Sequence, residues 1–224
     1  MSPSAQSTTS INPLLKRVQR ILKGTATFED RFVANHDDVP QLINFLRSMG
    51  CVIAFTTGNW DLFHIGHAKY IARGKEEATK HYPEADHVIM VVGLDTDEMT
   101  RKRKGPNRPI VNEQERAEVL GHLRAVDIIV PQYEPDQLFK LIKHDVRIVS
   151  HSTGDLPDED VIRAECEHLV KLPPQAETST TARVRRLAID GAYTELADLV
   201  GKLTPIVEEI NAKMGGFRSE IEKS

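Results

Sequence analysis

The sequence predicts an α/β fold in which a doubly wound sheet of five parallel strands is covered by helices on both faces. Short apolar segments alternate with segments of helical apolar spacing between residues 51 and 189. The short segments are apolar throughout rather than at every second residue, which is typical of parallel strands buried on both faces. Crossovers between such strands are right-handed, and ligands bind beyond the carboxyl ends of the central strands, where the strand order reverses.

The chain before the predicted sheet, residues 1–37, is expected to form a partly disordered N-terminal extension. Residues 1–12 are small and polar, and they lack the apolar core and cleavage signature of a signal peptide. Apolar residues at helical spacing predict a helix over residues 13–23 whose other face is basic. Such a helix can lie on a membrane, but this one is short, which favours packing on the domain or on a second subunit.

The domain itself is predicted over residues 38–190, and its first helix has Asp38 as N-cap, Pro40 in the first turn and Gly50 at its end. Strands are predicted at residues 51–55, 87–93, 127–130, 146–150 and 169–172. The helices that alternate with them are predicted at residues 65–80, 112–124, 135–143, 158–168 and 180–189. A C-terminal helical extension, residues 191–224, should carry a helix over residues 192–214 that Pro205 bends or splits.

The composition excludes several classes of protein. The chain has 224 residues, of which 40% are hydrophobic, and its formal net charge is −4. This charge gives no basic footprint for nucleic acid or for an anionic membrane, and no apolar stretch approaches the roughly 20 residues of a membrane span. The two cysteines, Cys51 and Cys166, form neither a disulfide framework nor a CxxC metal site. We therefore expect a cytoplasmic protein without nucleic-acid or membrane partners.

The first predicted strand continues directly into residues 56–67, TTGNWDLFHIGH. Gly58 permits a turn or a close approach to a ligand, and the helix that begins near His64 directs its unpaired N–H groups into the same crevice. His64 and His67 share one face of the first turn, and Gly66 between them leaves room for a phosphate. This combination favours a polyphosphate site, whereas a zinc site would need further ligands that have no recognisable spacing here.

The segment His64-Ile65-Gly66-His67, preceded by Gly58-Asn59-Trp60-Asp61, resembles the G-x-F-D-x-x-H-x-G-H signature of the cytidylyltransferase-like nucleotidyltransferases, with Trp60 in place of Phe. The chain is most similar to the adenylyltransferase half of bacterial heptose-phosphate kinase/adenylyltransferases, and next to glycerol-3-phosphate and ethanolamine-phosphate cytidylyltransferases. The resemblance extends over residues 38–187. It implies a Rossmann-like nucleotidyltransferase fold and transfer of a nucleotidyl group from ATP or CTP to a phosphorylated sugar or alcohol, with release of pyrophosphate.

The resemblance also implies catalytic roles. His64 and His67 would donate hydrogen bonds to phosphate oxygens in the transition state, and Lys104 would neutralise the leaving pyrophosphate. Lys104 lies in a basic segment, residues 100–109, that matches a mobile phosphate-binding loop of the family, and residues 101–103 could substitute for it. Mg²⁺ is the implied cofactor, held by the phosphates and water rather than by a protein-only site.

Further contacts follow from the same resemblance. The implied nucleotide-binding residues are Thr57, Gly58, Asn59, Trp60, Asp61, Gly66, Arg116, Thr178, Ser179, Thr180 and Thr181. The implied contacts to the acceptor or to phosphate are Asp95, Arg108 and His151. Two alternatives remain open: Arg116 could instead pair with a structural carboxylate, and the hydroxyl run at residues 178–181 could simply cap a helix.

The substrates remain open at this level. After the fourth predicted strand, relatives carry K-G-G-D-Y, whereas residues 150–155 read SHSTGD, so the base and the acceptor are undetermined. An FMN-type adenylyltransferase and a nucleotide-binding regulatory module without turnover are the alternatives. A class I aminoacyl-tRNA synthetase is disfavoured because the chain has no KMSKS-like loop. Since both termini extend beyond the predicted domain, we expect a homodimer.

Overall fold

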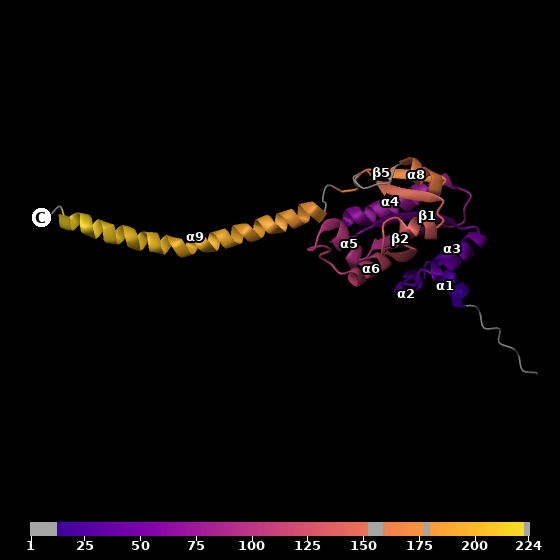
Figure 1. Ribbon diagram of the computed structural model, residues 1–224, viewed down its shortest axis with the longest axis horizontal. Helices are drawn as coiled ribbons and strands as arrows, with labels where there is room; N and C mark the ends of the chain where they lie inside the picture. The colour runs from indigo at the N-terminus through magenta and orange to yellow at the C-terminus, as the bar shows by residue number, and fades with distance from the viewer. Residues whose placement is uncertain (1–12, 152–158, 177–179, 222–224) are drawn as a thin grey trace, which may run out of the picture. The chain divides into compact units, whose positions relative to one another are not determined.

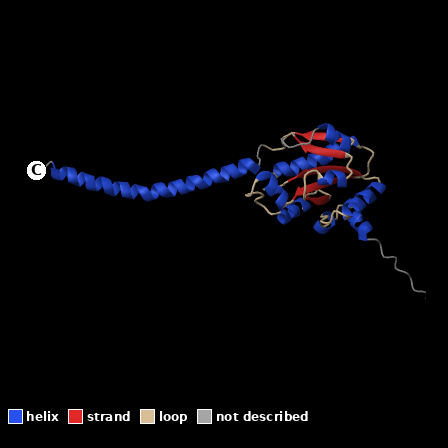
Figure 2. Ribbon diagram, viewed as in Figure 1, coloured by secondary structure: helices blue, strands red, loops and turns tan. Residues whose placement is uncertain are grey.

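The computed structural model describes residues 13–151, 159–176 and 180–221, and it divides the chain into two compact units, Met1–Glu177 and Thr178–Ser224. The first unit holds an all-parallel, five-stranded sheet with the strand order β3-β2-β1-β4-β5 (Figure 1). The strands are β1 (Val52–Gly58), β2 (Val88–Asp95), β3 (Ile128–Gln132), β4 (Val146–Ser150) and β5 (His168–Leu172). Helices lie on both sides of this sheet (Figure 2), which confirms the predicted fold class.

The strand order reverses between β1 and β4, and these two strands pair only briefly. β1 pairs with β2 along its whole length, from Val52 to Gly58, three residues further than the sequence predicted. Its register with β4 has only two pairs, and the last of them joins Phe55 to Arg147. Beyond that pair the two strands are no longer joined at their carboxyl ends, which is where a doubly wound sheet binds its ligand.

Two apolar clusters flank the sheet. The helices of the first unit are α1 (Pro13–Leu22), α2 (Phe28–Arg31), α3 (Asp38–Ser48), α4 (Ile65–His81), α5 (Asp97–Lys104), α6 (Glu113–Gly121), α7 (Gln137–Leu141) and α8 (Glu159–Glu165). One cluster joins α1, α3 and α7 to the β1 face that carries Ile53 and Phe55. The other joins α4 and α6 to the opposite face, which carries Ala54. The two faces of β1 are therefore both buried, as apolar parallel strands require.

Helix α1 packs on the domain, which is one of the two placements that the sequence left open. Val18 and Ile21 are buried in the same cluster as α3. Arg20 forms an ion pair with Asp30, and Arg17 donates to the backbone oxygen of Asp30 over 2.7 Å. Because these contacts tie α1 and α2 to the sheet, the compact unit includes residues that the sequence analysis assigned to an extension before residue 38.

The basic segment that we expected to be a loop is in large part a helix. Residues 97–104 form α5, which Thr96 caps by accepting a hydrogen bond from the backbone N–H of Met99. The helix ends at Gly105, whose φ of 97° few other residues adopt. Its basic residues lie in the last turn, where the helix dipole favours positive charge. The expectation of a loop was therefore wrong for residues 100–104 and holds only from Gly105 onward.

In its described residues the second unit is one continuous helix, α9 (Thr180–Ile221), of 42 residues. We predicted two helices, at residues 180–189 and 192–214, with a bend or break at Pro205. Neither Gly191 nor Pro205 ends the helix, so the prediction of separate helices was wrong. None of the described helices combines the length and the apolar character that crossing a bilayer requires.

A buried histidine lies between α7 and β4. His144 is 4% exposed, its ring lies 5.1 Å from that of Phe55, and its Nδ1 is 2.8 Å from the backbone oxygen of Ile142. Burial lowers the pKa of His144 from 6.5 to about 4. Because the unfolded chain takes up a proton at a higher pH than the folded chain does, stability is complete above about pH 6.5 and falls as the pH drops toward 4.

The variant His144→Phe should lose most of this pH dependence, since phenylalanine fills the same apolar site without titrating. From about pH 7.5 to about pH 5, the free energy of unfolding of the wild type should fall by on the order of 2 kcal/mol more than that of the variant. Urea unfolding at both pH values measures the difference. His87→Asn, at an exposed histidine, is the control and should behave as the wild type. Equal pH dependence in the wild type and His144→Phe would contradict the assignment.

Candidate active site

The first turn of α4 is capped by an imidazole. His64 has extended backbone angles, φ −142° and ψ 170°, and its Nδ1 accepts a hydrogen bond from the backbone N–H of Gly66 over 3.1 Å. This is the role that a serine or aspartate side chain plays at most helix starts. Since Nδ1 is the acceptor, the proton of the neutral ring is on Nε2, which makes Nε2 a hydrogen-bond donor.

The structure brings His64 and His67 together, as the sequence predicted. Their rings stack with centroids 4.0 Å apart and an interplanar angle of 26°. The ring of His67 also lies 5.2 Å from Phe63 and 5.6 Å from the indole of Trp60. Both histidines are half-buried, so each ring is held by packing while part of its surface remains open to solvent or ligand.

Gly66 is needed for the capping geometry, a reason that the sequence did not suggest, and its expected contact with a phosphate stays a prediction. We expected its missing side chain to leave room for a phosphate. A Cβ at this position would lie 2.8 Å from Cε1 and 2.9 Å from Nδ1 of His64, and 3.1 Å from the Cβ of Ala176. The space is therefore taken by the ring of His64 itself, and Gly66 permits the capping geometry.

Trp60 packs against His67 and contacts β2. Its φ is 56°, it is 5% exposed, and its Nε1 donates to the backbone oxygen of Gly93 over 2.9 Å. A Cβ on Gly58 would come within 3.0 Å of the indole, so the end of β1 must be a glycine for Trp60 to lie there. The replacement of phenylalanine by tryptophan thus adds a hydrogen bond to β2.

Asp61 and Arg108, for which we expected separate contacts to ligands, form an ion pair with each other. The buried carboxylate of Asp61 pairs with Nη2 of Arg108 at 2.7 Å. It also accepts hydrogen bonds from the backbone N–H groups of Ile110 and Val111, at 3.1 and 3.0 Å. This carboxylate therefore ties the segment after α5 to the turn that precedes α4, and the expected nucleotide and phosphate contacts of the two residues stay predictions.

Arg116 takes the structural alternative that the sequence left open. It is 1% exposed, and its Nη2 pairs with the carboxylate of Asp97 at 2.6 Å. Its other described hydrogen bonds go to the backbone oxygens of Asn59, Asp95 and Val111. The guanidinium joins α6 to the ends of β1 and β2, and the expected contact of Arg116 with the nucleotide stays a prediction.

Asp95 and the basic end of α5 form a second group of charges. Asp95 is 1% exposed and pairs with Arg103 at 2.9 Å, and burial raises the pKa of its carboxyl group. Lys102 pairs with Glu98 at 2.9 Å on the outer side of the helix. Loss of hydration and the charge of nearby Arg108 lower the pKa of Lys104. The carboxylates of Asp95 and Asp61 raise it, but by less. Lys104 thus lies close to these site residues.

The remaining expected residues are only partly placed. Thr57 is the second-last residue of β1. Asn59 follows the strand, and its Nδ2 is buried without a hydrogen-bond partner. The backbone N–H of His151 donates to Leu172 over 2.9 Å, and its side chain is exposed. Thr178 and Ser179 lie outside the described residues. Thr180 and Thr181 begin α9, and their side chains lie outside the description as well.

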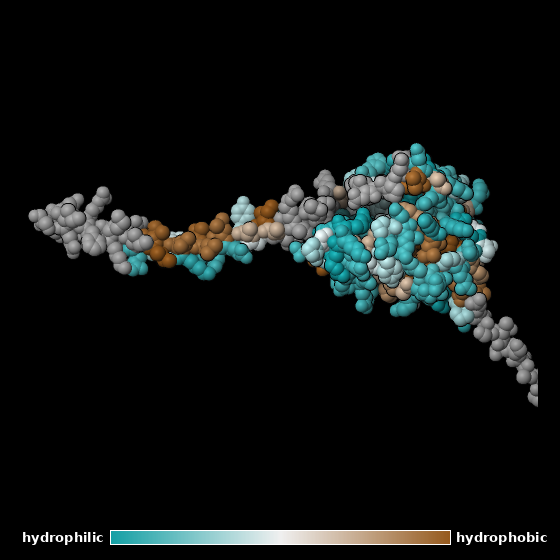
Figure 3. Space-filling view, viewed as in Figure 1, coloured by the Kyte–Doolittle hydropathy of each residue, from teal (hydrophilic) through white to brown (hydrophobic). Residues whose placement is uncertain are grey.

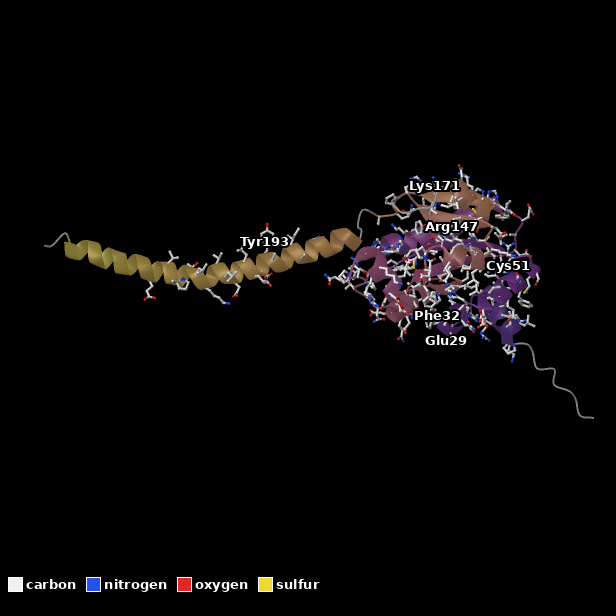
Figure 4. The ribbon with its side chains drawn as sticks, viewed as in Figure 1. Glu29, Phe32, Cys51, Arg147, Lys171 and Tyr193 are labelled. Carbon is white, nitrogen blue, oxygen red and sulfur yellow. The ribbon has the colours of Figure 1, made fainter. Side chains whose placement is uncertain are left out.

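One candidate residue, Arg147 of β4, was missed by the sequence analysis. It is 4% exposed and lies among the inner strands (Figure 4), with its guanidinium 4.5 Å from the ring of Phe55 and 4.0 Å from that of Phe139. Its Nη2 makes a long hydrogen bond, 3.4 Å, to Thr57 Oγ1, while its Nε and Nη1 are buried without a partner. Burial lowers its pKa to about 10. A lone arginine inside an apolar strand was the available signal.

The position of Arg147 relates it to the histidine pair. It belongs to the last registered pair of β1 and β4, and its charge acts on Tyr70 of α4, whose pKa is raised to about 12 by burial. The ring of Tyr70 lies 6.2 Å from Trp60, which in turn contacts His67. The unsatisfied guanidinium thus lies near the carboxyl end of β1, where β1 and β4 separate.

Comparisons with known proteins agree on one family. A family model described as cytidylyltransferase-like matches residues 55–183. The bifunctional protein HldE of Aliarcobacter butzleri is 31% identical over 69% of this chain and 31% of that protein. HldE of Nitratiruptor sp. is 30% identical over 77% of this chain and 35% of that protein. The chain spans about a third of the length of these relatives.

A solved structure was also found. The crystal structure of the lipopolysaccharide core biosynthesis protein from Thermoplasma volcanium is similar with a TM-score of 0.43 and 22% identity, and the match covers 54% of this chain and 95% of that one.

The capping geometry gives a prediction about Gly66. In Gly66→Ala the new methyl group should displace the ring of His64 and weaken its hydrogen bond to the backbone, so that the fraction of the neutral ring protonated at Nε2 falls. Imidazole nitrogen chemical shifts in the ¹⁵N-labelled protein report this fraction directly. Gly191→Ala, where a Cβ meets no atom within 4 Å, is the control. Unchanged His64 shifts in Gly66→Ala would show that the cap does not need the glycine.

Proposed function

Because the chain belongs to the cytidylyltransferase-like family, we propose that it transfers a nucleotidyl group from a nucleoside triphosphate to a phosphorylated sugar or alcohol and releases pyrophosphate. The family is the one that the motif at residues 64–67 predicted. The observation that carries the proposal is the stacked pair His64 and His67 in the first turn of α4, next to the point where the strand order reverses. Imidazole and backbone N–H donors at a helix start favour a bound polyphosphate.

The reaction needs positioning more than covalent chemistry. A phosphate oxygen of the acceptor attacks the α-phosphorus in line, a new P–O bond forms, and the bond to the bridging oxygen breaks as pyrophosphate leaves. Nε2 of His64 is the protonated nitrogen of the neutral ring and donates to a phosphate oxygen as its charge grows. His67 donates beside it, and stacking against its neighbours holds its ring in place.

The cation that meets the leaving pyrophosphate is Lys104 in this proposal. Of the other basic residues in the last turn of α5, Arg103 is paired with Asp95 and Lys102 with Glu98, while the exposed Arg101 stays an alternative to Lys104. Lys104 is exposed at the end of α5, and the pKa of its ammonium is lowered by loss of hydration and by the charge of Arg108. A negatively charged ligand would restore the interactions that this ammonium has lost.

The site fits Mg²⁺ only through phosphate oxygens and water. The buried carboxylates of Asp61 and Asp95 are already paired with Arg108 and Arg103. In the described part of the chain, no three histidine, cysteine, aspartate or glutamate side chains group together to hold a metal ion. Bound in this way, Mg²⁺ would shield the charge of the triphosphate and orient it.

Arg147 is the proposed contact for the phosphate of the acceptor. A buried guanidinium with two unpartnered nitrogens is costly, and a phosphate dianion supplies acceptors for both. The long bond to Thr57 places this group at the carboxyl end of β1, on the β1 face opposite α4. The triphosphate bound at α4 and the acceptor phosphate at Arg147 would then approach the same strand end from two sides.

The preferred substrates of this proposal are ATP and a sugar phosphate, in a cytoplasmic enzyme. The similarity to HldE proteins supports this choice, although the chain matches only about a third of their length. The experiment that tests the function measures pyrophosphate release for ATP and CTP, each with heptose, glycerol and ethanolamine phosphates. Release with ATP and the heptose phosphate is expected. Release with CTP alone would correct the base, and no release with any pair would overturn the proposed activity.

Replacement of either histidine should reduce turnover without unfolding the protein. By analogy with single donors in oxyanion holes, His64→Ala and His67→Ala should each lower kcat about 10²–10³-fold. Pyrophosphate release and the far-ultraviolet circular dichroism spectrum are the measurements. His122→Ala, at an exposed histidine that ends α6, is the control. Wild-type turnover in either site variant would contradict the catalytic role.

The proposed role of Arg147 predicts a split between the two substrates. Loss of a charge-assisted hydrogen bond costs about 1.5–3 kcal/mol, so Arg147→Met should raise KM for the acceptor roughly 10- to 100-fold and leave KM for the nucleotide nearly unchanged. Arg147→Lys should restore part of the loss, and Arg124→Met, at an exposed arginine, should have no effect. An equal rise in both KM values would place Arg147 outside the acceptor site.

A further inference from the structure

Six of the exposed apolar side chains of α9 recur with an alternating spacing. They are Ile189, Tyr193, Leu196, Val200, Leu203 and Val207. Successive members are separated by four, three, four, three and four residues, and each is at least 47% exposed. Figure 3 shows apolar residues gathered along this helix. Every second member of this series is therefore seven residues from the last, which is the heptad repeat of a left-handed coiled coil.

The sequence continues the same spacing to the end of the helix. Beyond Val207 the next apolar residues at separations of three and four are Ile210, Met214, Phe217 and Ile221. Taken from the sequence alone for these last four, the repeat extends over residues 189–221. That is more than the three to four heptads that characterise a coiled coil.

We propose that α9 pairs with α9 of a second copy of this chain in a parallel, two-stranded coiled coil. In the heptad notation abcdefg, Tyr193, Val200 and Val207 occupy position a, and Ile189, Leu196 and Leu203 occupy position d. Beta-branched residues at a together with leucine at d favour two parallel strands. We expected a homodimer because the chain extends beyond the domain at both ends. This proposal names the surface through which the two copies would pair and the register of the pairing.

The residues that disfavour a helix all lie away from this seam. Gly191 and Pro205 fall at position f, which faces away from the partner, Gly201 and Gly215 fall at position b, and Gly216 falls at position c. A helix with four glycines and a proline is a poor candidate to be stable alone in water, where isolated helices depend on good helix formers. Burial of the apolar seam against a second copy supplies the stabilisation that the helix lacks by itself.

A second copy is favoured over another partner because a heptad seam is self-complementary. Two identical chains in parallel bring each a residue opposite the same a residue, and each d residue opposite the same d residue. Leu199 and Ile206, at position g, are also exposed and would flank the seam on both sides. The paired surface would thus be continuous along the helix.

Sedimentation equilibrium of the full chain tests the pairing. The chain of 25.1 kDa should behave as a dimer, and Leu196→Glu combined with Leu203→Glu should convert it to a monomer, because paired charges in the seam repel each other. Lys202→Glu, one position before Leu203 and outside the seam, is the matched control and should remain a dimer. The near-ultraviolet circular dichroism spectrum reports whether the first unit stays folded in each variant.

Cysteine cross-linking tests the register. Under oxidising conditions Val200→Cys should form a disulfide between two chains, whereas Lys202→Cys should not, since position c faces away from the partner. A monomeric wild type, a trimer or tetramer, or a dimer that survives the double glutamate variant would each overturn the proposal. Cross-linking at residue 202 but not at residue 200 would overturn the parallel register. These results do not depend on the proposed activity, which the pyrophosphate assay tests separately.

Discussion

The geometry of the site depends on the way β1 ends. After Phe55 the strand no longer pairs with β4, yet it continues beside β2 as far as Gly58. Because Gly58 and Gly93 carry no side chains, the indole of Trp60 and the methyl group of Thr57 can lie over the ends of these strands. The chain then turns within a few residues and starts α4 beyond the carboxyl end of β1, the central strand. Without these glycines the first turn of α4, and with it the histidine pair, would be displaced.

Buried ion pairs hold the surrounding segments against this turn. The carboxylate of Asp61 joins Arg108 and the segment after α5 to the turn, and Arg116 joins α6 to the ends of two strands. Charges buried in this way require partners, because an unpaired buried charge is strongly destabilising. The signature of the family therefore contains residues of two kinds. Some, such as His64, present a donor at the helix start, and others position the chain that carries them.

The fold could be predicted from the sequence because its strands are buried on both faces, and the strand at residues 146–150 was predicted without error. Helix α5 was missed, although Thr96 and the acidic residues after it are a helix start, because the basic run that follows was interpreted as a loop. Gly191 misled the prediction, because the helix continues through the boundary expected there, and at Pro205 a split is excluded. The role of Asp61 could not be predicted, since its backbone partners lie 49 and 50 residues further along the chain.

Two buried arginines differ in how completely the protein satisfies their hydrogen-bond donors. Arg116 and Arg147 are both almost inaccessible to solvent, so both have lost their hydration. In Arg116, hydrogen bonds to the carboxylate of Asp97 and to three backbone oxygens replace the lost hydration. Arg147 has only the faces of two aromatic rings and one long bond to Thr57, which leave two of its nitrogens without acceptors. Aromatic faces compensate a guanidinium less completely than oxygen acceptors do, and this difference is the reason that we propose an anion ligand for Arg147 and not for Arg116.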